Sequence, residues 1–113
     1  MTPLVLILKP ITMKTIVQFV QIPKSEALEN YVEEKLSKLY TKYDWVIKTD
    51  VFFKKENDPS AKGKICTMEL SLPGPKIFAT SNQENYEHAA KETLNDVERQ
   101  LKKRKAQMKP HLL

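Results

Sequence analysis

Two stretches of this chain repeat apolar residues at helical spacing, and the segments between them alternate as strands do. Few folds accommodate this succession. The first helical stretch covers about 26–42, where Leu28, Val32 and Leu36 begin a series at three- and four-residue spacing. Ser25 precedes this series in the N-cap position, so we expect the helix to begin directly after it.

The second helical stretch follows Ser81, which stands three residues before Glu84 in the spacing of a capping box. Its apolar series continues to about residue 108, and Pro110 is expected to stop the helix there. The residues of this series are Tyr86, Ala90, Leu94, Val97, Leu101 and Met108.

Four other segments have the β-branched and aromatic residues, or the strict alternation, of strands. The alternation predicts which side chains share the apolar face of the second and third strands. The four strands are expected at 14–22, 46–55, 64–72 and 77–80. The apolar faces are expected to hold Ile47, Thr49, Val51 and Phe53 in the second strand and Cys66, Met68, Leu70 and Leu72 in the third.

The order β-α-β-β-β-α predicts an α+β fold, a four-stranded sheet with two helices packed on one face. A strand, helix and strand of this length favour a right-handed crossover with the first two strands parallel. The short connections that follow favour antiparallel strands. Each helix has one apolar stripe, so the other face of the sheet should be largely exposed to water.

One domain is expected over 13–109, with 110–113 as a tail. Residues 1–12 precede Met13, which opens a sequence like a natural start. We expect 1–12 to be an N-terminal extension outside the fold. An additional edge strand is the alternative.

The net positive charge of the chain lies entirely in its last residues. Residues 1–98 hold thirteen Lys or Arg and fourteen Asp or Glu, whereas residues 99–113 hold six Lys or Arg and no acid; the whole chain carries +5. Charge concentrated on one element indicates a polyanionic partner, of which nucleic acid is the obvious one. A basic face that serves only solubility is the alternative.

Both helices carry a polar stripe beside the apolar one, and these stripes are largely basic. If the two stripes face each other, they form a basic groove suited to a phosphate backbone. Arg99 and Lys103 stand further out toward solvent. The first stripe holds Tyr31, Lys35, Lys38 and Lys42, and the second holds Lys91, Asn95, Glu98, Lys102, Lys105 and Lys109.

Several kinds of chemistry are disfavoured by composition. Two glycines cannot build a glycine-rich phosphate loop, and His88 and His111 lack metal-ligand spacing. The single cysteine, Cys66, excludes an internal disulfide, fits a reducing cytoplasm, and is expected to be a buried packing thiol. No apolar run approaches the ~20 residues that span a bilayer. We therefore expect no enzyme activity, cofactor, metal, small-molecule substrate or membrane partner.

Three segments resemble the family of ribosome hibernation-promoting factors and ribosome-associated translation inhibitors, which is also described as sigma-factor modulation proteins. They are LSKL at 36–39 followed by Tyr43-Asp44, VFFKKEN at 51–57, and NYEHAA at 85–90 leading into RQLKKRK at 99–105. The spacing matches over roughly 95 residues, and the motifs are specific in combination.

This resemblance implies the same β-α-β-β-β-α fold, similar to a double-stranded RNA-binding domain. It also implies binding of the small ribosomal subunit in the channel for messenger and transfer RNA, which silences ribosomes and protects them in slow growth. The chain resembles short members, which lack the C-terminal domain that pairs two ribosomes in long members. A protein-interaction module that modulates a sigma factor is the alternative function. By position, the implied contacts with ribosomal RNA are Lys35, Lys38, Lys42, Lys91, Arg99, Lys102, Lys103 and Lys105, and the basic stripe adds Lys109.

Overall fold

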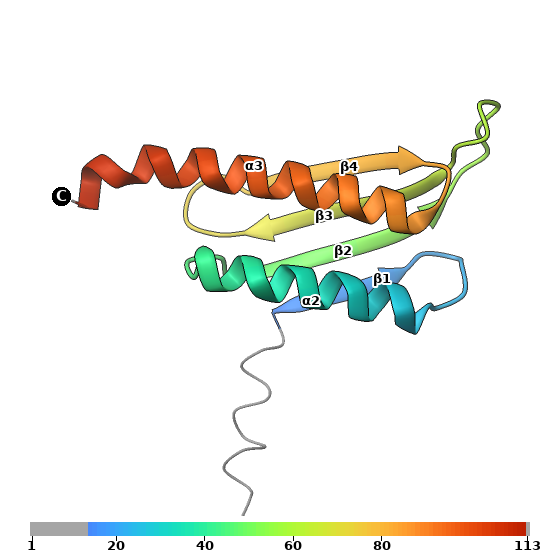
Figure 1. The fold of residues 1–113 in the computed structure, drawn as a ribbon, viewed down its shortest axis with the longest axis horizontal. Coiled ribbons are helices and arrows are strands. Elements are labelled where there is room, and N and C mark those ends of the chain that lie inside the picture. Colours follow the sequence, from blue (N-terminus) through green and yellow to red (C-terminus); the bar gives the residue numbers. More distant parts are fainter. Residues whose placement is uncertain (1–13, 113) are drawn as a thin grey trace, which may run out of the picture.

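The structure, a computed structural model, describes residues 14–112, and their side chains as far as Met108. The expected extension at 1–12 lies outside these residues. Strands and helices succeed one another in the predicted order β-α-β-β-β-α (Figure 1). They are β1 (Thr15–Phe19), α2 (Glu26–Lys42), β2 (Lys48–Lys55), β3 (Lys64–Ser71), β4 (Ile77–Gln83) and α3 (Tyr86–Leu112).

The four strands form one mixed sheet in the order β1-β2-β3-β4. The predicted parallel pairing of β1 with β2 is confirmed, with Val17 opposite Val51. The next two pairs are antiparallel, so that Met68 lies opposite both Val51 and Ala79. These four residues form a row across the sheet that faces the helices.

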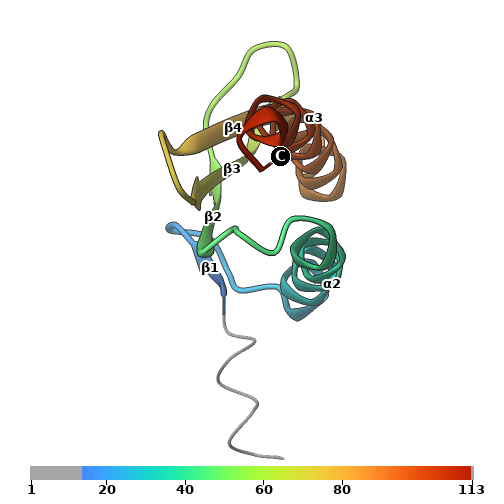
Figure 2. The same cartoon turned by 90° about the vertical axis from the view of Figure 1, so that its left-hand side faces the viewer.

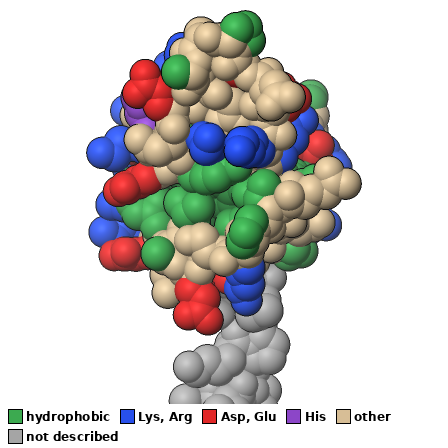
Figure 3. All heavy atoms as spheres, turned by 90° about the vertical axis from the view of Figure 1, so that its right-hand side faces the viewer, with side chains coloured by type: hydrophobic (Ala, Val, Ile, Leu, Met, Phe, Trp, Pro, Cys, Tyr) green, Lys and Arg blue, Asp and Glu red, His purple; other side chains and the backbone are tan. Residues whose placement is uncertain are grey.

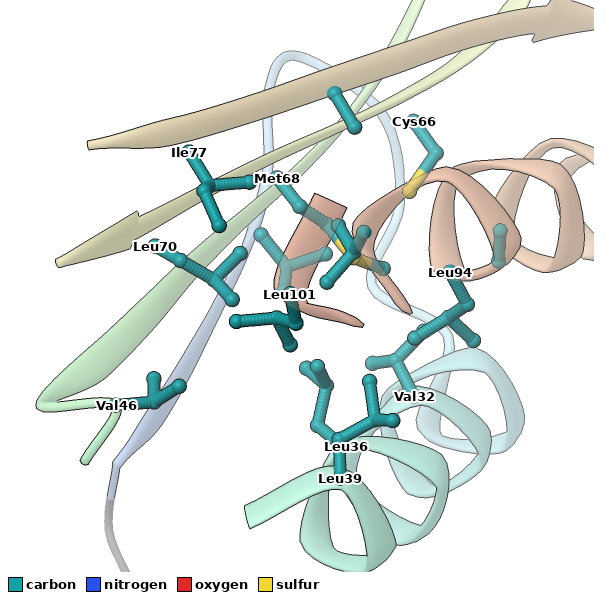
Figure 4. Close-up of a cluster of buried hydrophobic side chains, with 14 of the residues drawn as sticks. Val32, Leu36, Leu39, Val46, Cys66, Met68, Leu70, Ile77, Leu94 and Leu101 are labelled. Atoms are coloured by element: carbon teal, nitrogen blue, oxygen red, sulfur yellow. The ribbon is translucent and has the colours of Figure 1, made fainter. Parts of the chain in front are cut away.

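Both helices cover the same face of the sheet, as predicted (Figure 2). α3 packs on β3 and β4, whereas α2 contacts β1 and the flank of α3. Between these layers Leu36 of α2, Met68 of β3 and Leu101 of α3 are fully buried (Figure 4). Burial of this apolar surface is the main term that holds the helices on the sheet.

The first helix has the bounds that its sequence predicts. The Ser25 hydroxyl accepts a hydrogen bond from the Leu28 backbone N–H at 3.2 Å, and so caps the first turn. Glu26 and Glu29 lie in the first turn and Lys42 in the last, where their charges complement the helix dipole.

Strands β1 and β2 are shorter than predicted. β1 ends at Phe19 rather than at residue 22, because Gln21 adopts a left-handed backbone with φ of 58° that breaks the extended chain. β2 begins at Lys48, and Ile47 is 61% exposed instead of lying on the core face. Val46 occupies the buried place just before the strand.

The fourth strand begins at Ile77 as predicted, but its predicted end and the predicted start of the second helix were both wrong. Ser81 is no helix cap, because it continues β4 opposite Cys66 of β3. Asn82 also belongs to the strand, and its side-chain oxygen accepts the Gly63 N–H at 2.6 Å. The cap is Asn85, whose side-chain oxygen accepts the His88 N–H at 2.8 Å, and α3 begins at Tyr86.

The prediction that Pro110 stops the second helix was also wrong, because α3 continues to Leu112. A proline forfeits one backbone N–H, and so close to the end of a helix this removes a single hydrogen bond.

An aromatic cluster closes the end of the core beside the β1–α2 and β4–α3 connections. The Phe53 ring stacks on Phe19 at 5.4 Å between centroids and meets the edge of Tyr86 at 5.8 Å. Burial raises the pKa of the Tyr86 hydroxyl. Figure 3 views this end of the molecule and shows apolar side chains gathered at the surface, and the 41% exposed Val20 lies in the β1–α2 connection.

Candidate nucleic-acid interface

The two predicted polar stripes face each other across a groove between α2 and α3. Figure 2 looks along the two helices that form its walls. The groove encloses about 420 Å³. Its lining residues are Tyr31, Lys35, Lys38, Leu39 and Lys42 from α2 and Lys91, Leu94, Asn95 and Glu98 from α3.

The groove has an apolar floor and a basic rim. Leu39 and Leu94 are each only 8% exposed, and both belong to the hydrophobic core. Tyr31 is half-buried and packs against the same core. The lysine side chains stand above this floor and are exposed. Helical spacing produces this layout because each polar stripe directly flanks an apolar one.

Lysines 35, 38 and 91 line the groove without a carboxylate partner among the described residues. Lys35 Nζ lies 5.6 Å from the centre of the Tyr31 ring, which places the ammonium over the aromatic face. Unpaired cations gathered in a concave surface focus a positive potential and attract polyanions.

One ion pair crosses the groove. Lys42 Nζ donates to Glu98 Oε2 at 2.7 Å, and this hydrogen bond raises the pKa of Lys42. Glu98 is the one acid among the lining residues. The pair therefore cancels one of the four lysine charges of the groove.

The basic surface continues beyond the groove at the C-terminal end of α2. The Tyr43 ring has Lys105 Nζ at 5.6 Å from its centre and Lys42 Nζ at 6.0 Å, so an aromatic side chain joins the two helices there. Lys102 and Lys103 are exposed and form no ion pair within the described part of the chain.

One predicted residue stands apart from this surface, and the side chain of another is not described. Arg99 pairs with Asp96 of its own helix at 3.1 Å, with 69% of its side chain exposed. Lys109 lies near the end of α3, and its side chain is outside the described residues.

Arg104 has a structural role that the sequence analysis missed. Its guanidinium donates to the carbonyl oxygens of Pro73 at 3.0 Å and Pro75 at 2.8 Å, and so fastens α3 to the β3–β4 turn. Gly74 has a φ of 91°, and a Cβ built on it would lie 3.3 Å from Arg104 Nη1. No sequence pattern signals this contact, because its acceptors are backbone atoms about thirty residues away.

The open face of the sheet differs from the groove in charge. Lys48 Nζ lies 3.6 Å from Asp50 Oδ2, and Lys76 Nζ lies 3.9 Å from Glu69 Oε1. Phe78 is 55% exposed on this face. With its cations paired, this face lacks the excess positive charge found along the helices.

Cys66 and Thr93 have structural roles in the core. Cys66 is fully buried, as predicted, and burial raises the pKa of its thiol to about 12. The Thr93 hydroxyl donates to the carbonyl oxygens of Cys66 and Ala89, at 3.1 Å and 2.7 Å. Among the side chains of residues 14–108 no group of three or more acidic, His or Cys residues is placed to bind a metal, and no helix within residues 14–112 could cross a bilayer.

Comparison with known proteins identifies relatives of this fold. Residues 15–109 match the family described as sigma 54 modulation protein / S30EA ribosomal protein. A ribosomal subunit interface protein from Coxiella burnetii has a TM-score of 0.72 at 24% identity, over 81% of this chain and 97% of that one. The N-terminal domain of Thermus thermophilus Protein Y has a TM-score of 0.66 at 18% identity, over 80% and 96%. The sequence matches no curated protein.

Proposed function

The chain belongs to the sigma 54 modulation protein / S30EA ribosomal protein family, as its motifs predicted, and we propose that it is a ribosome-associated hibernation factor. It binds the small ribosomal subunit in the channel for messenger and transfer RNA. Translation stops because the bound protein occupies that channel. Such a protein acts in the cytoplasm, and its expression would serve slow growth or stress.

The observation that carries this proposal is the groove with its unpaired lysines. Lys38 of α2 and Lys91 of α3 come from distant parts of the chain, yet they line one concave surface, and neither forms an ion pair among the described residues. Ribosomal RNA presents a dense array of phosphates, and lysine ammonium groups bind phosphates while releasing condensed counterions. The Coxiella burnetii relative, a ribosomal subunit interface protein, supports the same partner.

The proposed RNA contacts follow the groove and its extension. Lys35, Lys38 and Lys91 contribute unpaired charges inside it, and Lys42 contributes when its pairing with Glu98 is exchanged for a phosphate. Positions along α3 continue the contact beyond the groove. They are Arg99, Lys102, Lys103, Lys105 and Lys109.

Occlusion of the channel requires tight binding and a bulky protein rather than a reacting group. Because the proposed binding is to phosphates, the affinity should depend steeply on salt. Each phosphate contact contributes roughly 0.7–0.9 to the slope of log affinity against log salt. The protein is 113 residues long, and two helices on a sheet give it a rigid body to place in a channel.

Co-sedimentation with purified small subunits across a salt series tests the proposal. The variant is Lys102→Glu with Lys105→Glu, and the matched control is Lys48→Glu with Lys76→Glu, which changes the net charge equally on the open face. We expect wild type and control to sediment at low salt and to dissociate steeply as salt rises. The α3 variant should remain in the supernatant with an unchanged melting temperature.

Two results would contradict the proposal at different levels. If the α3 variant sediments like wild type, the assignment of α3 is overturned. If wild type fails to sediment at low salt, ribosome binding is overturned. The next partner to test is then a purified sigma factor, and binding that persists at high salt and after nuclease treatment would support it.

A further inference from the structure

The floor of the groove is suited to a ligand that a phosphate backbone alone does not provide. Leu39 and Leu94 are almost fully buried beneath it, and the half-buried Tyr31 forms part of its wall. Phosphates need only cations on an accessible surface. A hollow of about 420 Å³ with an apolar floor has the size and lining of a site for a small organic group.

The flat, apolar part of RNA is the nucleobase. Tyr31 lines the groove with an aromatic ring over which Lys35 Nζ lies, 5.6 Å from the ring centre, so a base that stacks on that face takes the place of the ammonium. Stacking on an aromatic side chain accepts any base, because every base has a π face. Lys38 and Lys91 stand on the two walls and are placed to hold phosphates.

Two polar side chains in the groove are matched to the edge of a base. The side chain of Asn95 is exposed and makes no hydrogen bond with the rest of residues 14–108, so its amide is available both to donate and to accept. Glu98 uses one carboxylate oxygen for Lys42, which leaves acceptor capacity on the other oxygen for an exocyclic amino group.

We propose that the groove between α2 and α3 holds one unpaired nucleotide, with the base on Tyr31, Leu39 and Leu94 and its phosphates on the surrounding lysines. The inference deepens the proposed function, on which it rests for the source of the nucleotide. A base within a duplex cannot reach the floor without leaving its stack, and the energy required is least when the base is already unpaired. The site therefore selects unpaired positions, whereas a double-stranded RNA-binding domain reads duplex shape.

The first test compares two RNA hairpins of equal length and charge, one fully paired and one with a single bulged nucleotide. Fluorescence anisotropy measures the affinity of wild type, Tyr31→Phe and Tyr31→Leu. Wild type and Tyr31→Phe should prefer the bulged hairpin, because both keep the aromatic face. Tyr31→Leu fills the space without a π face and should lose roughly 5- to 150-fold in affinity for the bulged hairpin, at an unchanged salt slope.

Two outcomes would overturn the inference: equal affinity of wild type for the two hairpins, or a Tyr31→Leu protein that keeps the preference. Thermal denaturation of each variant identifies loss of folding. If Tyr31→Leu is unstable, the comparison of the two hairpins with wild type still tests the inference, because it needs no variant.

A second test shows whether a base or only a phosphate enters the groove. Adenosine 5′-monophosphate and uridine 5′-monophosphate are titrated into wild type, with inorganic phosphate as the control, while methyl resonances of Leu39 and Leu94 are followed. Shifts with nucleotides but not with phosphate place a base on the floor. If phosphate produces the same shifts, or if no ligand moves either methyl group, the base site is contradicted.

The same variants separate this inference from the proposed function. If wild type and Tyr31→Leu sediment equally with small subunits and neither distinguishes the hairpins, ribosome binding is supported and the nucleotide site is contradicted. If the nucleotide shifts are observed but wild type does not sediment, the nucleotide site stands and the ribosomal partner falls.

Discussion

Lys42 and Glu98 form a hydrogen-bonded ion pair of 2.7 Å that joins the end of α2 to the middle of α3 across the groove. The two side chains are 57% and 36% exposed, so the pair contributes little to stability. Its main effect is on binding, because it withholds one lysine from the anion that the groove attracts.

Replacing the acid should strengthen RNA binding. Glu98→Gln removes the one carboxylate that lines the groove and frees Lys42, while the amide oxygen of the new side chain can still accept from the edge of a base. Affinity for RNA should rise several-fold, and the salt slope should steepen by roughly one phosphate contact, or about 0.7–0.9. Binding measured across a salt series checks both quantities. Glu92→Gln is the control, because Glu92 lies on the same helix but pairs with His88 outside the groove; a weaker-binding Glu98→Gln protein would contradict the role of the pair.

Arg104 and Lys102 should respond in opposite ways to the same change of charge. Arg104→Gln loses two hydrogen bonds to the turn that contains Pro73 and Pro75, and should lower the free energy of unfolding by about 1 kcal/mol. Its salt slope for RNA should stay as in wild type. Lys102→Gln should leave stability unchanged and flatten the slope. Urea denaturation and anisotropy on both variants give the comparison, and a flattened slope for Arg104→Gln would show that this side chain also contacts RNA.

The hydroxyl of Tyr40 should stabilise the fold. It lies 2.7 Å from Thr15 Oγ1 and donates to Thr49 Oγ1 at 2.8 Å, and Thr49 is fully buried. Tyr40→Phe leaves that threonine without its donor, so we expect a loss of about 1–2 kcal/mol in urea denaturation. Tyr31→Phe is the control, since the Tyr31 hydroxyl has no hydrogen-bond partner within residues 14–108. Equal losses in the two variants would rule out the buried network as the cause.

Cys66 should be unreactive in the folded protein. The thiolate is the reactive form, and burial raises the thiol pKa from 9.0 to about 12. A disulfide-exchange reagent at pH 8 should therefore react at the rate of unfolding and accelerate sharply in urea. Fast labelling without urea would show that the core opens locally.

The same shift makes stability depend on alkaline pH. Because the folded pKa lies above the unfolded one, the contribution of the Cys66 thiol is complete below pH 9 and declines as pH rises from there toward 12. Burial also raises the pKa of Tyr40 and Tyr86, which adds a decline in the same direction. Urea denaturation at pH 8 and pH 10.5 should show a smaller decline for Cys66→Ala than for wild type. An equal decline would assign the effect to the tyrosines.

Features set by neighbouring residues were predictable from the sequence. The bounds of α2 follow from its apolar spacing and from Ser25, whose cap involves a backbone N–H only three residues away. The apolar face of β3 follows from alternation, and Cys66, Met68 and Leu70 are all fully buried. Because local preference and tertiary packing agree in these elements, their bounds and buried faces can be predicted from the sequence alone.

Features set by distant partners were not predictable. Ser81 and Glu84 satisfy the spacing of a capping box, but pairing with β3 keeps Ser81 in the strand. Ile47 fits the alternation of β2, but the strand begins after it, and its N–H donates to the Ser71 carbonyl at 2.7 Å. Pairing across the sheet decides between the two local interpretations of Ser81, whereas Ile47 keeps a hydrogen bond to β3 although its side chain is exposed.

The candidate site likewise has features that the sequence predicts and contacts that it does not. Helical spacing predicted the two stripes, and the structure brings them together around Lys38 and Lys91. The spacing could not show that Glu98 binds Lys42, or that Arg104 binds the β3–β4 turn, because each contact depends on how α3 lies against another element. Sequence periodicity thus predicts which side of a helix a residue lies on. The contacts that the residue makes on that side become known only from the folded structure.

The sheet beneath the two helices also sets the width of the groove between them. α3 rests on β3 and β4, α2 lies along β1, and neighbouring strands keep a separation of about 4.8 Å. The width between the walls is therefore determined by backbone spacing, and the lysines above it can be exchanged without altering that width. Selection on such a scaffold can adjust how strongly an anion is held independently of how large a group is admitted.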